Sequence, residues 1–199
     1  MRNRPSLRWL SCGLVLCLLA GLVRPAIAAL PEFRVSFTRE VRSEPYSGRV
    51  YLFFTRGKNQ EPRSGPNWFN PEPLVAVDVQ DWQPGAVLTI NSATPQLIAS
   101  PRPAGELDVM GLRVQAVARF NPYERVVGHG PGNGFSAAAD VGAGGTTPQS
   151  LTINQLVPEP PFPENRWFKP LSVRSDALSQ FQQREVTLRA AVLLPASYY

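Results

Sequence analysis

The sequence predicts an all-β fold, an antiparallel β-sandwich of about seven short strands. Three observations favour this fold class. Apolar and polar residues alternate in one segment after another, which is the period-two pattern of half-buried strands. Turn signals rich in Gly and Pro separate these segments at short intervals. Before residue 170, no segment shows the sustained 3.6-residue period of a helix. A fully closed barrel would produce the same pattern and is the structural alternative.

The first 28 residues predict a secretory signal peptide. Arg2, Arg4 and Arg8 precede an apolar run over residues 10–23, and a small-x-small cleavage site follows at residues 26–28. The apolar run is shorter than the roughly 20 residues that a membrane-spanning helix needs, which argues against a retained anchor. We therefore expect cleavage after this segment and export to the bacterial periplasm or the extracellular medium.

The cysteines and the net charge of the expected mature chain indicate how it is stabilised and which partners it does not favour. Cys12 and Cys17 both lie in the signal segment, so the expected mature chain of 171 residues has no disulfide and depends on its core for stability. Cleavage also removes four arginines and no acidic residue, which lowers the formal net charge from +5 to +1. The remaining charges are interspersed. The sequence therefore argues against nucleic acid, and against a membrane after cleavage, as partners.

The strand predictions follow the alternation along the chain. The predicted strands cover residues 33–37, 48–55, 74–79, 85–90, 112–120, 135–141 and 151–157. The segment 74–79 follows a long proline-rich loop and places Val75, Val77 and Val79 on one face, which belongs in a core. In the segment 112–120, the polar face with Gln115 is expected to point to solvent. Together these segments predict a sandwich domain over residues 29–157.

The remaining residues predict two further segments. Residues 158–170 hold five prolines and are expected to form a stiff connector. Residues 171–199 then predict a short strand, one helical turn capped by Ser175, and a strongly apolar strand over residues 186–194. Either this last strand completes the sandwich, or it leads toward a further domain that the chain does not contain.

Three stretches of the chain resemble a known family. Residues 61–85 (EPRSGPNWFNPEPLVAVDVQDWQPG), 114–141 (VQAVARFNPYERVVGHGPGNGFSAAADV) and 184–199 (REVTLRAAVLLPASYY) resemble the N-terminal Ig-like region of bacterial secreted esterases of the enterochelin esterase-like group. The resemblance covers most of residues 33–199. In that family, the segment similar to residues 194–199 leads into an α/β-hydrolase domain with the serine nucleophile and its acid and histidine partners. The resemblance implies an Ig-like accessory domain, or a truncated gene product, that packs on or positions a hydrolase domain.

The residues needed for hydrolysis are not evident in the sequence. The Gly-x-Ser-x-Gly motif, which places a serine on a strained strand-to-helix turn, does not occur. His129 is the only histidine, and the glycines around it predict a mobile loop, although a catalytic base needs a rigid setting. The sequence therefore predicts that the chain alone is not an enzyme. An esterase that uses His129 is the alternative.

Metal ions and cofactors are not expected either. One histidine and no mature cysteine exclude the usual zinc ligand sets. Asp78 and Asp81 would offer oxygen atoms to calcium, but they lack the spacing of an EF-hand, and capping of a turn is the simpler interpretation. We therefore expect no cofactor and no metal ion.

Exposed aromatic residues are the one positive signal for binding. Trp68, Phe69 and Trp82 lie at loop or strand-end positions, where a flat ring can stack on a sugar or on another protein. The competing interpretation is that these rings close one end of the core. The alternative function is therefore a free-standing glycan-binding β-sandwich that uses these three residues.

Overall fold

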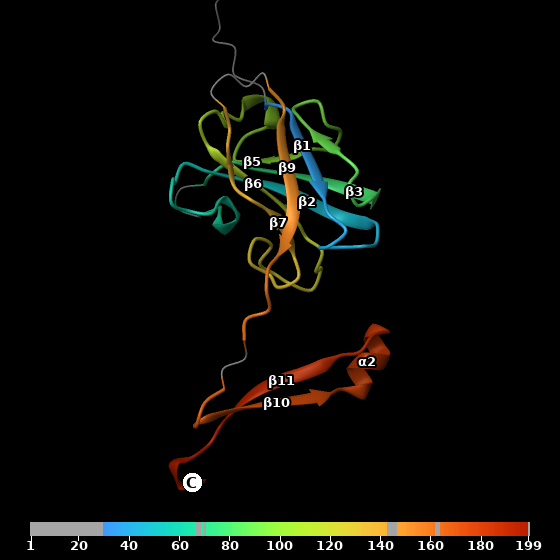
Figure 1. The fold of residues 1–199 in the computed structure, drawn as a ribbon, viewed down its shortest axis with the longest axis vertical. Helices are drawn as coiled ribbons and strands as arrows, with labels where there is room; N and C mark the ends of the chain where they lie inside the picture. The colour runs from blue at the N-terminus through green and yellow to red at the C-terminus, as the bar shows by residue number, and fades with distance from the viewer. Residues whose placement is uncertain (1–29, 67–68, 70, 143–146, 162–163, 199) are drawn as a thin grey trace, which may run out of the picture. The chain divides into compact units, whose positions relative to one another are not determined.

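The computed structural model consists of two compact units, of which the first ends at Leu156 and the second begins at Val157 (Figure 1). The described residues are 30–66, 69, 71–142, 147–161 and 164–198. The predicted signal peptide lies outside them.

The first unit is built from strands. Its strands are β1 (Phe33–Phe37), β2 (Tyr46–Thr55), β3 (Leu74–Trp82), β4 (Leu88–Ile90), β5 (Ile98–Ser100), β6 (Arg113–Ala118), β7 (Gly134–Ser136), β8 (Ala139–Asp140) and β9 (Gln149–Leu156). Two short 3-10 helices, η2 (Pro62–Ser64) and η3 (Ala104–Glu106), lie between strands. The predicted all-β class is confirmed, and every predicted strand segment of this unit contains a strand. The additional strand β5 was missed, because its three residues lie between Pro95 and Pro101.

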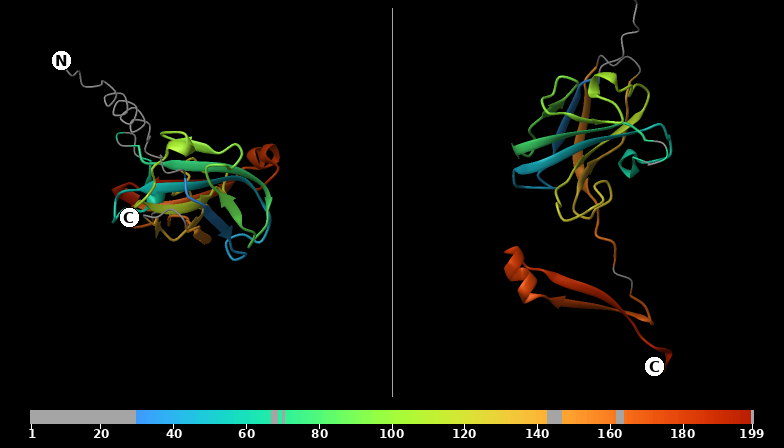
Figure 2. Two further views of the ribbon diagram at one scale, coloured as in Figure 1. Left: turned by 90° about the horizontal axis from the view of Figure 1, so that it is seen from above. Right: turned by 180° about the vertical axis from the view of Figure 1, so that it is seen from behind.

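The strands form one curled sheet in the order β4-β1-β9-β7-β6-β2-β3-β5, with β8 paired to β6. Figure 2 shows the curl from two further directions. β1 pairs antiparallel with β4 but parallel with β9, where Phe33 lies opposite Gln149. The sheet is therefore mixed, and the antiparallel pairing predicted for the whole fold is wrong at this pair. Alternation along one strand fixes its two faces, but it does not determine the direction of the neighbouring strand.

A single hydrophobic core is filled by the residues that the alternation assigned to it. Phe33, Val35 and Phe37 of β1 are fully buried. The valine face predicted for β3 is confirmed, since Val75 and Val77 are buried. Val79, the third residue of that face, packs against the same core.

The outer face of β6 is covered, contrary to the prediction. Gln115 is only 1% exposed, although the alternation placed it toward solvent. Its side-chain oxygen accepts a hydrogen bond from the backbone N–H of Arg63 in η2 (3.2 Å), and its amide nitrogen donates to the carbonyl of Ser136 (2.8 Å). The loop that carries η2 folds over β6, and this long-range contact has no signature in the local pattern.

Replacing Gln115 by alanine is expected to lower the free energy of unfolding by about 1–3 kcal/mol, because the buried carbonyl of Ser136 and the N–H of Arg63 lose their partners. Chemical denaturation measures this change. The matched control is Gln155→Ala on β9, where the side chain is exposed and the expected change is below about 0.5 kcal/mol. Equal losses in the two variants would contradict the buried role of Gln115.

The second unit is a hairpin of two strands with a short helix between them. Its elements are β10 (Phe168–Arg174), α2 (Asp176–Gln182), β11 (Thr187–Leu193) and the 3-10 helix η4 (Ala196–Tyr198). The predicted helix cap is confirmed, because the Ser175 hydroxyl accepts a hydrogen bond from the N–H of Leu178 (3.3 Å). No helix in the described part of the chain is long and apolar enough to cross a bilayer.

Two expectations for this region need correction. β10 begins inside the range 158–170 that was predicted to be a connector, and it includes Pro170. A proline is tolerated there because each strand of a two-stranded sheet is an edge strand. β11 corresponds to the predicted apolar strand, but it pairs with β10 in a separate sheet and does not join the nine-stranded one.

Candidate functional site

The aromatic residues singled out from the sequence do not form one binding surface. Trp82 lies in the core at 7% exposure, its ring packs edge-on against Phe37 (4.6 Å between centroids), and its indole N–H donates to the carbonyl of Ala86 (2.9 Å). Phe69 is 99% exposed. Trp68 lies outside the described residues. The ring of Trp82 therefore closes the core, in agreement with the packing interpretation.

His129 is positioned next to a serine that is distant in sequence. Its Nε2 atom lies 3.0 Å from the hydroxyl oxygen of Ser64, the last residue of η2. Its Nδ1 atom lies 3.4 Å from a guanidinium nitrogen of Arg63, and Arg63 also forms an ion pair with Glu61 (2.6 Å). No local pattern in the sequence points to Ser64, because the two residues belong to separate loops.

The neighbours of His129 differ from those of a catalytic histidine. In a serine triad, a carboxylate accepts the Nδ1 hydrogen, which leaves Nε2 free to take the serine proton. A guanidinium has only donors, so Nδ1 of His129 faces a group to which it can only act as acceptor. The neutral ring then carries its hydrogen on Nε2 and donates it to Ser64. In this tautomer, the ring has no nitrogen free to accept the serine proton.

Gly128 lets the loop around His129 approach η2 closely. A guanidinium N–H of Arg63 donates to the carbonyl of Gly128 (2.7 Å), and a Cβ atom at Gly128 would lie only 1.8 Å from the Arg63 carbonyl oxygen. The side chain of Asn133 is fully buried, and it donates to the carbonyl of Val127 (2.9 Å). The sequence suggested a mobile loop, whereas these contacts anchor it to the body of the unit.

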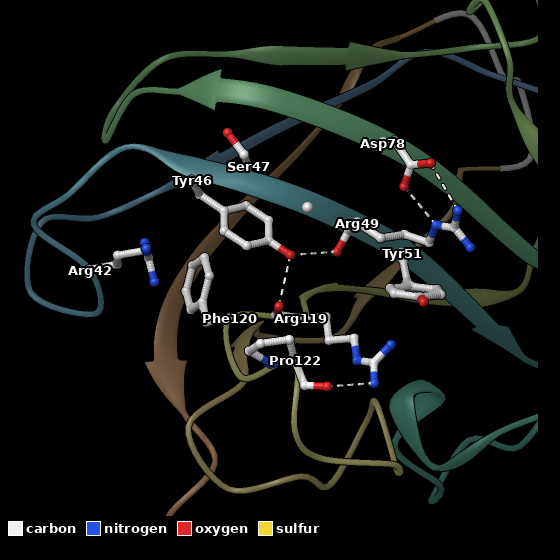
Figure 3. A pocket seen from close by; sticks show the side chains of 10 residues that line it. Arg42, Tyr46, Ser47, Arg49, Tyr51, Asp78, Arg119, Phe120 and Pro122 are labelled. Carbon is white, nitrogen blue, oxygen red and sulfur yellow. Dashed lines mark hydrogen bonds and ion pairs between the residues drawn. The ribbon is translucent and has the colours of Figure 1, made fainter. Parts of the chain in front are cut away.

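A pocket of about 560 Å³ opens beside β2 and β3 (Figure 3). It is lined by Arg42, Tyr46, Ser47, Gly48, Arg49, Tyr51, Asp78, Arg119, Phe120 and Pro122. Arginine and aromatic side chains dominate this lining, and Asp78 is its one acidic residue. Positive charge therefore exceeds negative charge around the cavity.

The acidic residue of the pocket is neutralised by its neighbour across the sheet. Arg49 lies opposite Asp78 in the register of β2 and β3, and its guanidinium forms two hydrogen bonds to the carboxylate (2.7 and 2.8 Å). These hydrogen bonds lower the pKa of Asp78 and raise the pKa of Arg49. Both carboxylate oxygens are thus engaged by Arg49. The described residues contain no cluster of three or more potential metal-binding side chains.

Tyr46 forms the rigid base of the pocket. Its side chain is buried, and its hydroxyl lies within hydrogen-bonding distance of two backbone carbonyls, those of Arg119 (2.8 Å) and Arg49 (3.2 Å). Its ring packs edge-on against Phe120 (5.0 Å between centroids). Burial raises the pKa of Tyr46 to about 12, so the hydroxyl stays neutral and serves as a donor.

This raised pKa of Tyr46 predicts a loss of stability in alkali. The unfolded phenol ionises near pH 10, whereas the folded one holds its proton to about pH 12. The contribution of the neutral Tyr46 hydroxyl to the free energy of unfolding is therefore complete below pH 10. It is lost as the pH rises to about 12, by roughly 2–3 kcal/mol in total. Chemical denaturation at pH 9 and pH 11.5 measures this loss. Tyr46→Phe should show a shallower decline, and identical slopes for variant and wild type would contradict the assignment.

Comparison of the chain with protein-family models, with curated proteins and with solved structures finds no match.

Sequence reasoning could have detected only part of this pocket. The alternation in β2 and β3 places Arg49 and Asp78 on the outer faces of their strands, and a correct strand pairing would have joined them. Arg42 and Arg119 lie outside the strands, and no local pattern relates them to each other. That both line one pocket depends on the path of the loops, and Figure 3 shows their side chains on opposite sides of the Phe120 ring.

Proposed function

We propose that the chain is a non-catalytic accessory module of a secreted esterase, exported to the periplasm or beyond, which packs on or positions an α/β-hydrolase domain. The observation that carries this proposal is an apolar face on the hairpin of the second unit. Export is supported by the basic, apolar and small-residue pattern of residues 1–28.

The apolar face is defined by the strand register of the hairpin. Leu171 lies opposite Ala190, and Val173 lies opposite Leu188, so these four side chains project from the same side of the two strands. Val192 follows Ala190 by two residues and shares this side. Leu171, Val173 and Leu188 are 49%, 50% and 53% exposed. The described structure therefore leaves a contiguous apolar surface accessible on the hairpin.

The opposite side of the same strands is polar toward the end that carries α2. Ser172 lies opposite Arg189 and Arg174 lies opposite Thr187, and Arg189 forms an ion pair with Glu159. In the half of the hairpin next to α2, this separation is typical of strands that cover an apolar core on one face only. In the other half the two sides are mixed, because Lys169 lies opposite Val192 and Phe168 lies opposite Leu193. A two-stranded sheet is marginally stable by itself in water, and exposed apolar patches mark sites of protein contact. The pattern thus favours a protein partner that covers the apolar side.

The resemblance and the chemistry of the first unit support a hydrolase domain as the partner. β11 lies within residues 184–199, one of the three stretches that resemble the secreted esterase family. In that family, this region adjoins the hydrolase domain. The contacts of His129 with Ser64 and Arg63 give no activated nucleophile, which is consistent with catalysis by another domain.

The proposal includes an Ig-like relationship for the first unit. Its all-β composition and its single core of inward-facing side chains support this relationship. The parallel pairing of β1 with β9 departs from the antiparallel pairing expected for an Ig-like sandwich.

The experiment measures binding of the purified protein to an α/β-hydrolase domain from the resembled esterase group, produced without its own Ig-like region. Isothermal titration should detect a complex that the double variant Val173→Asp/Leu188→Asp abolishes. The matched control Ser172→Asp/Thr187→Asp adds the same two charges on the opposite side of the hairpin and should retain binding. No complex with the wild type, or equal effects of the two double variants, would refute the proposal.

A further inference from the structure

The arginine-lined pocket of the first unit has a charge balance that favours an anionic ligand. Three arginines line it, whereas Asp78 is its single carboxylate and is already bound by Arg49. Arg49 and Asp78 cancel each other, so Arg42 and Arg119 leave two positive charges without an acidic counterpart in the lining. A concave surface with an excess of one sign concentrates ligands of the opposite charge.

Arg119 is held in place by backbone groups. One of its terminal nitrogens donates to the carbonyls of Pro122 (3.0 Å) and Glu124 (2.9 Å). These contacts fix the guanidinium but do not neutralise it, and none of the ion pairs among the described residues involves Arg119. Figure 3 shows the side chains of Arg49 and Arg119 extending to the same part of the pocket as Tyr51. These two contacts use both hydrogens of that nitrogen, and Nε is buried. The other terminal nitrogen is therefore the one suited to donate to an oxyanion.

Arg42 provides the second uncompensated charge. Its guanidinium lies over the rings of Tyr46 and Phe120, at 5.6 Å from each centroid. Its Nε atom is buried and has no hydrogen-bond partner among the described residues. Stacking on two aromatic rings holds this cation at the wall of the pocket without neutralising its charge.

The size and the walls of the pocket indicate what accompanies the anionic group. A cavity of about 560 Å³ lies in the range of small-molecule sites, and it exceeds the space that a bare ion needs. Tyr51 and Phe120 contribute aromatic surfaces. The hydroxyl of Ser47, another lining residue, is bound to Asp81. We propose that this pocket binds a small organic oxyanion, that is, a carboxylate or a phosphate ester carried on a ring-sized body.

The test compares four probes by isothermal titration with the purified protein: glucuronate, glucose 6-phosphate, neutral glucose and inorganic sulfate. At least one of the two organic anions is expected to bind at least tenfold more tightly than glucose and than sulfate, and the tighter of the two identifies the preferred acidic group. Binding of both organic anions no tighter than glucose would overturn the proposal. If sulfate bound as tightly as the better organic anion, the claim that the pocket recognises the ring-sized body of the ligand would be overturned.

Variants locate the site. Arg119→Gln is expected to weaken binding of the better organic anion at least tenfold, and Arg42→Gln, which removes no backbone contact, three- to tenfold. The matched control is Arg34→Gln, because Arg34 pairs with Glu32 and does not line the pocket, and its affinity should stay within twofold of wild type. If Arg119→Gln fails to fold, the affinity of Arg42→Gln for the better organic anion serves as the test of the site. An affinity of Arg42→Gln within twofold of wild type, or equal to that of Arg34→Gln, would refute the assignment.

Discussion

Replacing Phe37 by alanine is expected to lower the free energy of unfolding by about 3–5 kcal/mol, the largest effect of any single change considered. Phe37 is fully buried, and its ring packs edge-on against Trp82 (4.6 Å) and Phe120 (5.6 Å). Removing it leaves a cavity where β1, the end of β3 and the segment after β6 meet. Chemical denaturation followed by tryptophan fluorescence measures the loss.

The chain offers a control of the same residue type. Phe69 is 99% exposed, so Phe69→Ala is expected to change the stability by less than about 0.5 kcal/mol. A loss of less than about 1 kcal/mol for Phe37→Ala would mean that the aromatic end of the core is not packed as described.

Replacing Gly128 by alanine is expected to cost about 3 kcal/mol, because the new methyl group has no space. It would lie 1.8 Å from the carbonyl oxygen of Arg63, which is backbone and cannot rotate away. The loop must then move, which separates the His129 ring from Ser64. Denaturation gives the loss of stability, and the NMR signals of the His129 ring report its displacement.

Gly105→Ala serves as the comparison for this second variant. No atom lies within 4 Å of a Cβ placed at Gly105, and the expected change is within about 0.5 kcal/mol. If Gly128→Ala were as stable as Gly105→Ala, the loop around His129 would not be anchored to η2, and the mobile loop expected from the sequence would be the better description.

The features that the sequence predicted are those set by local chemistry. The alternation of Phe33, Val35 and Phe37 predicted their strand and its buried face. Successive side chains in a strand point to opposite faces, so no knowledge of the partner strand is needed. Ser175 predicted its helix start for a similar reason, since a cap acts within one turn. Strong local signals of this kind needed no knowledge of the rest of the fold.

The features that the sequence did not predict all depend on long-range contacts. Gln115 is buried because the η2 loop covers it, and the parallel direction of β9 beside β1 depends on the path of the whole chain between them. The same holds for the pair of Ser64 and His129, which lie on separate loops, and for the arginines of the pocket. Periodicity can assign a residue to a face, but it cannot identify what packs on that face.

Hydrolysis of p-nitrophenyl butyrate by the purified protein alone tests most directly whether the chain depends on another domain for chemistry. We predict that ester cleavage in the presence of the protein is no faster than uncatalysed hydrolysis in buffer alone. His129→Ala and Ser64→Ala should leave this rate unchanged. Turnover by the wild-type protein that either substitution abolishes would contradict the account, because it would show that the Ser64–His129 pair acts as a nucleophile and base despite the guanidinium at Nδ1.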